Sequence, residues 1–339
     1  MKYGLNPHQS AKLISKMPFD ILNGIPSTIN ILDATYSYNL CNELSKILNK
    51  KVVASYKHTS PAGVAINKPL SKSLREMYNL TEEDQISDIT LAFIRAKNSD
   101  PKSSFGDFLG FSHEVDIQTA NLIKEDFSNG IIAPSYSDEA LEVLKNRNKF
   151  LILKVVNPIK LLPKTQIREI WGMKIEEEIN NYMTPNDYPT DIIIANQTLK
   201  YTQSNSIVMA YDGQVIGVGA GQQSRIDCVR IACNKSKNWF GRMSPEIVEM
   251  YKILGGKKPS KINEIYNYLS LSDMYINMNN ISLASDGFFP FTDSIKLAKN
   301  YGVTEIIQPG GSINDRLIQK CCDKHNITQY ISGTRLFMH

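Results

Sequence analysis

The spacing of apolar positions predicts two runs of alternating helices and strands. In the first half, a polar loop precedes a helix, a strand, a helix and a strand, at residues 103–108, 117–124, 130–134, 137–145 and 150–156. The second half repeats this order at residues 285–291, 293–300, 303–308, 314–324 and 329–332. Helices that alternate with short apolar strands are typical of layered α/β proteins. The recurrence indicates an internal duplication.

Further elements are predicted outside these two runs. Residues 51–55 favour a short strand, and residues 206–219 favour a hairpin that turns at Asp212-Gly213. Thr81 is a candidate N-cap for a helix that ends at Ser99-Asp100-Pro101. One face of this helix carries Ile86, Ile89, Phe93 and Ala96.

Two segments, residues 157–190 and 235–280, fit neither run and are interpreted as insertions, the second largely helical. No low-complexity stretch separates the two halves. We therefore divide the chain into a first subdomain at residues 1–190 and a second at residues 191–339.

The composition is that of an ordinary globular protein. Of 339 residues, 42% are hydrophobic and 21% are charged, with a net charge of +4. No dense Lys/Arg stripe occurs, which argues against nucleic-acid binding. No apolar run approaches the roughly 18 residues of a membrane span, and the first residues lack a secretory pattern, so we expect a cytoplasmic protein without a membrane partner. The five cysteines form no Cys-x-x-Cys pair and are expected to be buried thiols.

The dipeptide Lys57-His58 is a candidate catalytic pair. It follows the strand at 51–55, so it places two different proton-handling groups at a strand end. Adjacent strand residues face opposite ways, and both side chains reach one site only if the backbone turns there, which Pro61 and Gly63 favour. The alternative is a solvated surface lysine beside a loop histidine.

A glycine-rich turn, residues 217–225, leads into a helix whose apolar face includes Ile226, Val229 and Cys233. Free backbone N–H groups at such a turn suit an anion. The dinucleotide fingerprint needs a third glycine where Gln222 stands, and no phosphate-binding Gly-Lys-Ser/Thr follows. The glycines could equally serve packing alone.

Two other segments allow more than one interpretation. Three phenylalanines around Pro290 could form one wall of a flat-ligand pocket or only an apolar plug, and residues 309–312 could be only a turn. The His-x-Glu and Pro-Cys-x-x-Cys pattern of zinc deaminases is absent, and no other metal-ligand cluster stands out, so no metal is expected.

Eight segments together resemble the AICAR transformylase domain of the bifunctional purine-synthesis enzyme. They occur in order as Lys2-Tyr3-Gly4-Leu5-Asn6-Pro7-His8-Gln9, Lys57-His58-Thr59-Ser60-Pro61-Ala62-Gly63, Ser103-Ser104-Phe105-Gly106-Asp107-Phe108, Gly130-Ile131-Ile132-Ala133-Pro134, Lys200-Tyr201-Thr202-Gln203-Ser204-Asn205-Ser206, Gly219-Ala220-Gly221-Gln222-Gln223-Ser224-Arg225-Ile226, Ser285-Asp286-Gly287-Phe288-Phe289-Pro290-Phe291 and Arg335-Leu336-Phe337-Met338-His339. The resemblance runs from Lys2 to His339. It implies two cytidine-deaminase-like α/β/α subdomains without zinc, and active sites at a homodimer interface. The cyclohydrolase domain that precedes this region in the family is expected to be a separate protein here.

The resemblance implies transfer of a formyl group from 10-formyltetrahydrofolate to the 5-amino group of AICAR, giving FAICAR and tetrahydrofolate. That amine is a poor nucleophile because its lone pair is delocalised into the ring. By resemblance, His58 is the general base, Lys57 stabilises the oxyanion and helps the folate nitrogen leave, and Asn205 orients the carboxamide or formyl oxygen.

Binding roles are also implied by the resemblance. Lys2, Tyr3, Arg335 and His339 match positions near the nucleotide phosphate. Phe105, Gly106, Arg225 and Phe288 match positions that hold the AICAR ring, carboxamide or ribose. Ile226, Pro290 and Asp293 match positions on the folate side.

Three positions depart from the family. Lys2 stands where arginine is common, so a bidentate phosphate contact becomes a point charge. Asn129 stands where an aspartate lies near the nucleotide. We expect weaker binding at these two places, whereas Met338 in place of a histidine is expected to be tolerated. A non-catalytic nucleotide-binding regulator and a structural subunit of a split enzyme are the alternatives. The joint presence of Lys57, His58 and Asn205 argues against both.

Overall fold

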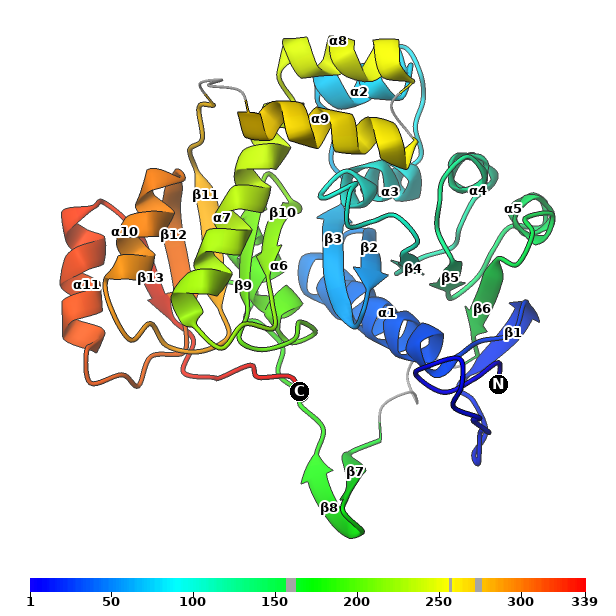
Figure 1. The fold of residues 1–339 in the computed structure, drawn as a ribbon, viewed down its shortest axis with the longest axis horizontal. Coiled ribbons are helices and arrows are strands. Elements are labelled where there is room, and N and C mark those ends of the chain that lie inside the picture. Colours follow the sequence, from blue (N-terminus) through cyan, green and yellow to red (C-terminus); the bar gives the residue numbers. More distant parts are fainter. Residues whose placement is uncertain (157–162, 256–257, 272–275) are drawn as a thin grey trace.

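A computed structural model describes residues 1–156, 163–255, 258–271 and 276–339. Its centre is a mixed sheet of 11 strands that runs through both halves of the chain (Figure 1). In spatial order the strands are β1 (Phe19–Asn23), β6 (Leu151–Val155), β5 (Gly130–Ala133), β4 (Phe108–Phe111), β2 (Val52–Lys57), β3 (Ser60–Ile66), β10 (Gln214–Gly219), β9 (Ile207–Tyr211), β11 (Ile281–Ser285), β12 (Val303–Gln308) and β13 (Thr328–Ile331).

The same strand pairing occurs twice in this sheet. β2 and β3 form an antiparallel hairpin, β4 is antiparallel to β2, and β5 and β6 continue in parallel. β9 and β10 form the second hairpin, β11 is antiparallel to β9, and β12 and β13 continue in parallel. The two sets meet where Gln214 of β10 pairs with Ala65 of β3. The repeated order of elements along the sequence therefore corresponds to a repeated topology.

Helices cover both faces of the sheet, which makes three layers. The helices are α1 (Thr28–Leu48), α2 (Lys72–Met77), α3 (Asp88–Lys97), α4 (Ile117–Lys124), α5 (Asp138–Lys145), α6 (Thr190–Leu199), α7 (Arg225–Arg242), α8 (Pro245–Leu254), α9 (Pro259–Leu271), α10 (Asp293–Asn300) and α11 (Asp315–Lys324). α1 and α6 share one core with the central strands. α3, α4 and α5 pack on the opposite face of the first half, and α7, α10 and α11 on that of the second.

Most predicted elements are confirmed. Both loop-preceded runs have their helices and strands within two residues of the predicted bounds, and the hairpin turns at Asp212-Gly213. The second insertion is largely helical, through the end of α7, α8 and α9. The five cysteines are buried free thiols, as expected.

The predicted start of one helix at Thr81 is wrong. α3 begins at Asp88, and its N-cap is Ser87, whose side chain accepts the backbone N–H of Thr90 at 3.3 Å. The backbone N–H and the hydroxyl of Thr81 both donate to the Asp84 carboxylate, at 2.6 and 2.8 Å. This local turn satisfies the groups that a helix would otherwise use, which is how short polar side chains compete with helices.

The first insertion contains a separate two-stranded sheet, β7 (Thr165–Ile170) and β8 (Met173–Glu178). Figure 1 shows it projecting from the body as an arm. None of the described helices is long and apolar enough to cross a lipid bilayer.

Candidate functional site

Lys57 and His58 lie at the tight turn between β2 and β3. Lys57 is the last residue of β2, and the strand therefore runs two residues further than the predicted 51–55. His58 and Thr59 form the turn with φ values of 55° and 57°. The backbone does turn here, but Pro61 and Gly63, which were expected to favour the turn, lie within β3. The side chains of Lys57 and His58 line one cavity of about 510 Å³ together with Ala220, Gln222 and Lys235. The two proton-handling groups thus share one space.

Asp33 of α1 supports this turn from below. Its carboxylate accepts the backbone N–H of Thr59 at 2.7 Å, and the residue is only 7% exposed. Burial raises the pKa of Asp33 to about 6, against the opposing effects of the Thr59 N–H and of the nearby His58. Asp33 could not be found from the sequence, because one carboxylate inside a helical pattern carries no signal of what packs against it.

The loop before β4 lies beside Lys57. The Lys57 ammonium donates to the backbone oxygen of Phe105 at 2.5 Å, and the Asn129 amide donates to that of Gly106 at 2.7 Å. Gly106 has a φ of 72°, a conformation that favours glycine. The structure therefore brings Phe105, Gly106 and Asn129 together with Lys57.

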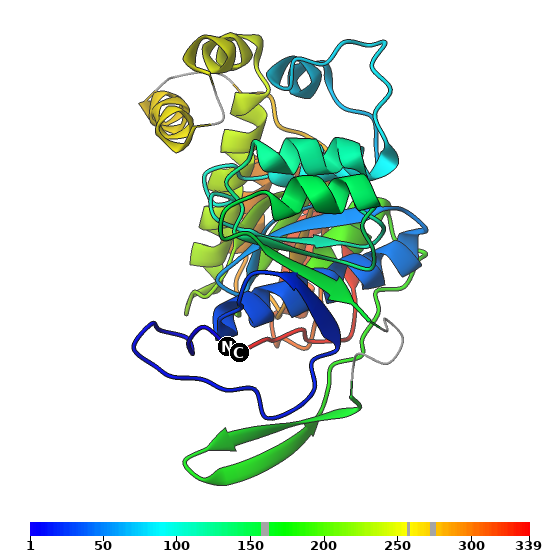
Figure 2. The same cartoon turned by 90° about the vertical axis from the view of Figure 1, so that its right-hand side faces the viewer.

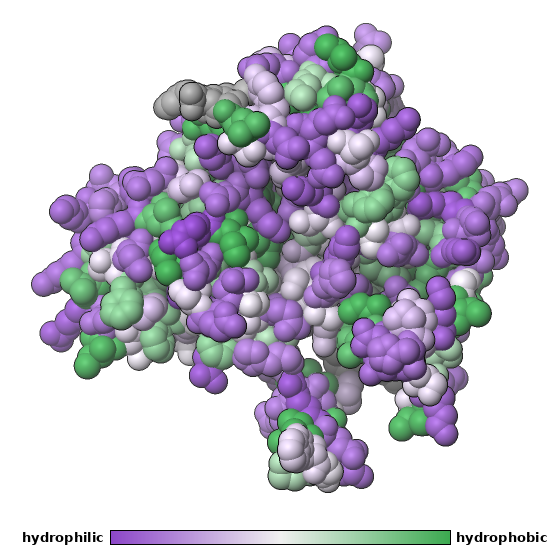
Figure 3. Space-filling model, viewed as in Figure 1, coloured by the Kyte–Doolittle hydropathy of each residue, from purple (hydrophilic) through white to green (hydrophobic). Residues whose placement is uncertain are grey.

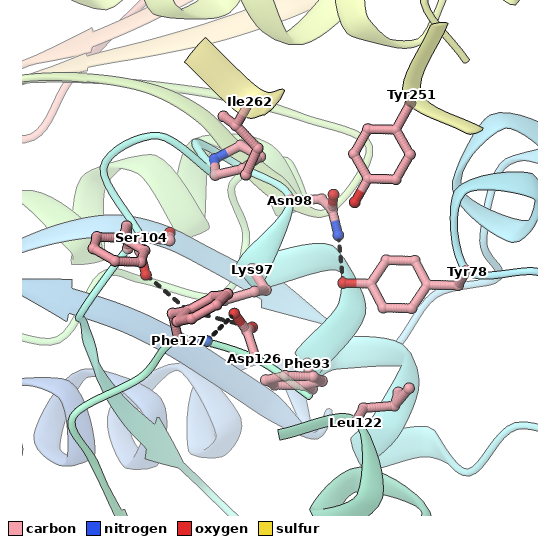
Figure 4. Close-up of a pocket in the computed structure, with 12 residues that line it drawn as sticks. Tyr78, Phe93, Lys97, Asn98, Ser104, Leu122, Asp126, Phe127, Tyr251 and Ile262 are labelled. Atoms are coloured by element: carbon pink, nitrogen blue, oxygen red, sulfur yellow. Dashed lines mark hydrogen bonds and ion pairs between the residues drawn. The ribbon is translucent and has the colours of Figure 1, made fainter. Parts of the chain in front are cut away.

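A buried ionic cluster holds this loop from inside. Lys97 donates to the backbone oxygen of Ser104 at 2.8 Å and to the Asp107 carboxylate at 2.7 Å, with Asp126 at 3.4 Å. Figure 4 shows Lys97 pointing toward Ser104 and Asp126 below the Phe127 ring. Burial raises the pKa of Asp107, and Lys97 opposes that effect. The cavity here is about 40 Å³, too small for a nucleotide, so the cluster supports the loop.

A second cavity, of about 470 Å³, lies at the start of α7. Five predicted site residues line it, namely Asn205, Arg225, Phe288, Pro290 and Arg335. The Arg225 guanidinium donates to the Asn205 side-chain oxygen at 2.9 Å and to the backbone oxygen of Ser206 at 3.0 Å. It also forms an ion pair with Asp286, which is fully buried. Asp286, to which the sequence analysis gave no role, holds the Arg225 side chain in place.

The glycine-rich turn runs between the two cavities. Gln222 lines the cavity of Lys57 and His58, whereas Gln223 lines that of Arg225. The side chain of Asn205 donates to the backbone oxygens of both glutamines, at 2.9 and 3.1 Å. Gln203 links the β2–β3 turn to the glycine-rich turn. Its side chain donates to the Thr59 hydroxyl at 3.0 Å, and its backbone oxygen accepts from the backbone N–H of Gly221 at 2.9 Å.

The glycines of β10 serve close packing. A Cβ at Gly217 would collide with the backbone oxygen of Ala232, and one at Gly219 with that of Cys228, both on α7. These two glycines let the strand approach the helix, which is the packing alternative considered for this turn. Gly221, with a φ of 67°, meets no such neighbour.

The remaining predicted residues line neither cavity of the single chain. Lys2 and Tyr3 lie beside the start of α1, where the Lys2 N–H donates to Pro26 and the Tyr3 oxygen accepts from Thr28. Ile226 is half-buried in the first turn of α7, and Asp293 is exposed at the start of α10. The exposed His339 stacks edge-on against Phe337, 5.9 Å between ring centres. Within the described parts of the chain, no group of three or more His, Cys, Asp or Glu side chains could hold a metal ion.

Comparisons with known proteins find relatives along the whole chain. The sequence model of the "AICARFT/IMPCHase bienzyme" family matches residues 1–235. The whole chain aligns with proteins named bifunctional purine biosynthesis protein PurH, at 30% identity in Aquifex aeolicus, 29% in Caldicellulosiruptor saccharolyticus and 30% in Bacillus cytotoxicus. The chain spans 59% of the length of each of these relatives.

Proposed function

Because the chain belongs to the AICARFT/IMPCHase bienzyme family, we propose that it carries the formyltransferase activity of purine biosynthesis. It transfers the formyl group of 10-formyltetrahydrofolate to the 5-amino group of AICAR, giving FAICAR and tetrahydrofolate. The observation that carries the proposal is the shared cavity of Lys57 and His58, one general base and one cation on a turn held by Asp33. A site that only bound a nucleotide would need no such pair.

The proposed chemistry is one acyl transfer. The amine nitrogen of AICAR attacks the formyl carbon, and His58 takes the proton that the nitrogen loses. Lys57 stabilises the negative oxygen of the tetrahedral intermediate and aids departure of the folate nitrogen. As the C–N bond breaks, this nitrogen receives the proton that His58 took from the amine. General acid–base catalysis contributes about 10²–10⁴-fold, and electrostatic stabilisation of the oxyanion a comparable factor.

The second cavity is proposed to hold the remainder of the substrates. Arg225, joined to Asn205 by a hydrogen bond, is assigned to donate to the AICAR carboxamide, and the half-exposed Phe288 offers an aromatic face to its ring. Asn205 would reach the carboxamide or formyl oxygen by exchanging one of its bonds to the backbone oxygens of Gln222 and Gln223. Arg335, with Lys2, Tyr3 and His339, is assigned to the phosphate. Phe105, Gly106 and Asn129 are assigned to the nucleotide, and Ile226, Pro290 and Asp293 to the folate.

We further propose that the active chain is a homodimer with interfacial sites. In one chain, Lys57 and His58 line one cavity and Arg225 and Arg335 another, while Lys2, Tyr3 and His339 line neither, and this separation supports the arrangement. The repeated strand topology supports two deaminase-like subdomains that arose by duplication, with a boundary near residue 190. A cytoplasmic location stays a prediction.

A direct assay tests the activity. Purified protein is mixed with AICAR and 10-formyltetrahydrofolate, and tetrahydrofolate formation is followed by absorbance. We expect turnover by the wild type and a loss of about 10²–10⁴-fold in kcat for His58→Ala. His113→Ala is the matched control, because His113 is exposed after β4 and lines neither cavity.

Two results would contradict the proposal. A wild type that binds AICAR without turnover would instead identify a nucleotide-binding regulator. Full activity of His58→Ala would refute the assigned base even if formyl transfer were observed.

A further inference from the structure

The arm formed by β7 and β8 exposes apolar side chains with nothing packed on them. Trp171 at its tip is 98% exposed, Ile167 is 67% exposed and Met173 is 60% exposed. Figure 3 shows the arm as a projection separate from the body, with apolar residues among polar ones. A two-stranded hairpin is marginally stable on its own in water, and exposed apolar patches mark interaction sites. The exposed apolar side chains of the arm are thus available to a partner surface.

The arm meets the rest of the described chain at its base. Arg168 of β7 donates to the backbone oxygen of His339 at 3.2 Å. Within the arm, the same Arg168 forms an ion pair with Glu177 of β8. The base consequently lies beside the C-terminal tail that carries Arg335 and His339. The distal half, with Trp171 and Met173, extends away from this point.

The N-terminal segment, residues 1–17, is a second exposed surface, which contacts the body of the chain near Lys2, Tyr3 and Met17. Ile14 is 89% exposed, Leu5 58% and Leu13 42%. Residues 10–16 make no hydrogen bond or ion pair with any other described residue. Such an unpaired extended segment offers both backbone groups and apolar side chains to a strand edge.

The charges of the two surfaces are opposite. Residues 1–17 contain Lys2, Lys12 and Lys16 and no acidic residue. The arm, residues 165–178, carries four glutamates against one arginine and one lysine. Both project from the lower part of the molecule in Figure 2, so a neighbouring copy can face both at once.

We propose that the arm of one copy packs on residues 1–17 of a second copy, and that the second copy's arm packs on the first in return. Reciprocal contacts of this kind are what a two-fold interface requires, since each surface is used twice. The inference rests on the homodimer of the proposed function and names the surface that builds it. The contact brings Lys2 and Tyr3 of one copy toward the Arg335–His339 tail of the other.

Charge reversal tests the contact without removing the arm. Glu176→Lys with Glu178→Lys makes the arm basic. These two positions are chosen because both glutamates lie on the face of the ribbon that carries Ile167. Lys12→Glu with Lys16→Glu makes the N-terminal segment acidic. Each double variant is expected to shift the monomer–dimer equilibrium toward monomer by tenfold or more in sedimentation equilibrium, since like charges then face each other. Glu142→Lys with Glu249→Lys, both exposed on α5 and α8, is the control.

Mixing the two reversed proteins supplies the rescue. In the mixture, each arm meets a segment of opposite charge in both contacts, so a heterodimer is expected at wild-type strength. Rescue also shows that neither variant is simply misfolded. If both variants dimerised as the wild type does, or if the mixture stayed monomeric, the proposed contact would be wrong.

Trp171 gives an independent readout. The chain has two tryptophans, and the other, Trp239, is 8% exposed. Acrylamide quenching of the fluorescence is expected to increase on dilution in the wild type and to lose this dependence in Trp171→Phe. A dimer in which Trp171 stays fully quenchable would overturn the proposal. Formyl transfer is measured separately, so an active enzyme insensitive to all arm variants would refute the contact and leave the function intact. A rescued dimer without turnover would support the contact and refute the proposed function.

Discussion

The carboxylate of Asp33 accepts the backbone N–H of Thr59 at 2.7 Å, directly below the turn that carries His58. Both turn residues have positive φ, which costs a non-glycine residue on the order of 1 kcal/mol or more. The buried acceptor offsets part of that cost. Asp33 is thus a positioning residue for the proposed base, and it acts through the backbone of the turn.

The first prediction concerns stability against pH. The pKa of Asp33 is raised from 3.8 to about 6, so between these values the folded protein binds more protons than the unfolded chain. The contribution of Asp33 to stability therefore falls as pH rises through this window, by roughly 3 kcal/mol at 1.36 kcal/mol per unit. In Asp33→Asn, which keeps an acceptor oxygen but cannot ionise, this fall is expected to be smaller. Parallel stability curves for wild type and variant from pH 4 to 7 would contradict the prediction.

The second prediction separates the acceptor from the charge. Asp33→Ala leaves the Thr59 N–H without its partner, a loss of about 1–3 kcal/mol for a buried donor. We expect kcat to fall while the Kd for AICAR changes little, because the turn that aims His58 loosens and the second cavity is untouched. Asp33→Asn should retain most of the kcat. Equal losses in the two variants would mean that the charge, and not the turn, matters.

The third prediction concerns the buried pair of Arg225 and Asp286. Asp286→Ala leaves the guanidinium buried and unpaired, which costs about 3–5 kcal/mol of unfolding free energy. The control is Asp227→Ala, which removes the exposed partner of Arg230 on the same helix and should cost about 1 kcal/mol or less. Chemical denaturation measures both. Similar small losses would show that the pair is not a buried support of Asn205.

The fourth prediction concerns Lys2. An arginine presents a planar fork that binds two phosphate oxygens, whereas lysine offers a point charge. Lys2→Arg is expected to tighten AICAR binding by up to about tenfold, near 1.4 kcal/mol, with kcat unchanged. Lys12→Arg serves as the control, because residue 12 is not assigned to the phosphate. Calorimetric titration decides the matter, and an unchanged Kd for Lys2→Arg would remove Lys2 from the assigned site.

Much of the fold follows from local signals. α4, β5, α5 and β6, and their counterparts α10, β12, α11 and β13, follow from apolar spacing, because hydrogen bonds within a helix and the alternation of a strand act over a few residues. The turn at Asp212-Gly213 follows from two residues that tolerate positive φ. The helix start at Ser87 was missed because two serine- and threonine-based caps, six residues apart, compete on nearly equal terms.

The sequence by itself determined the repeated element order, the series of motifs that identifies the family, and the pair Lys57-His58. Only the tertiary structure decided that Asp33 lies beneath His58 and that Asp286 holds Arg225. It also decided that the pair Lys57-His58 and the group around Arg225 line separate cavities on either side of a glycine-rich turn. The physical reason is the range of the interactions. Capping, turns and periodicity join near neighbours in sequence, whereas the support of a site joins residues 26 and 61 positions apart that meet only when the sheet and its helices have packed.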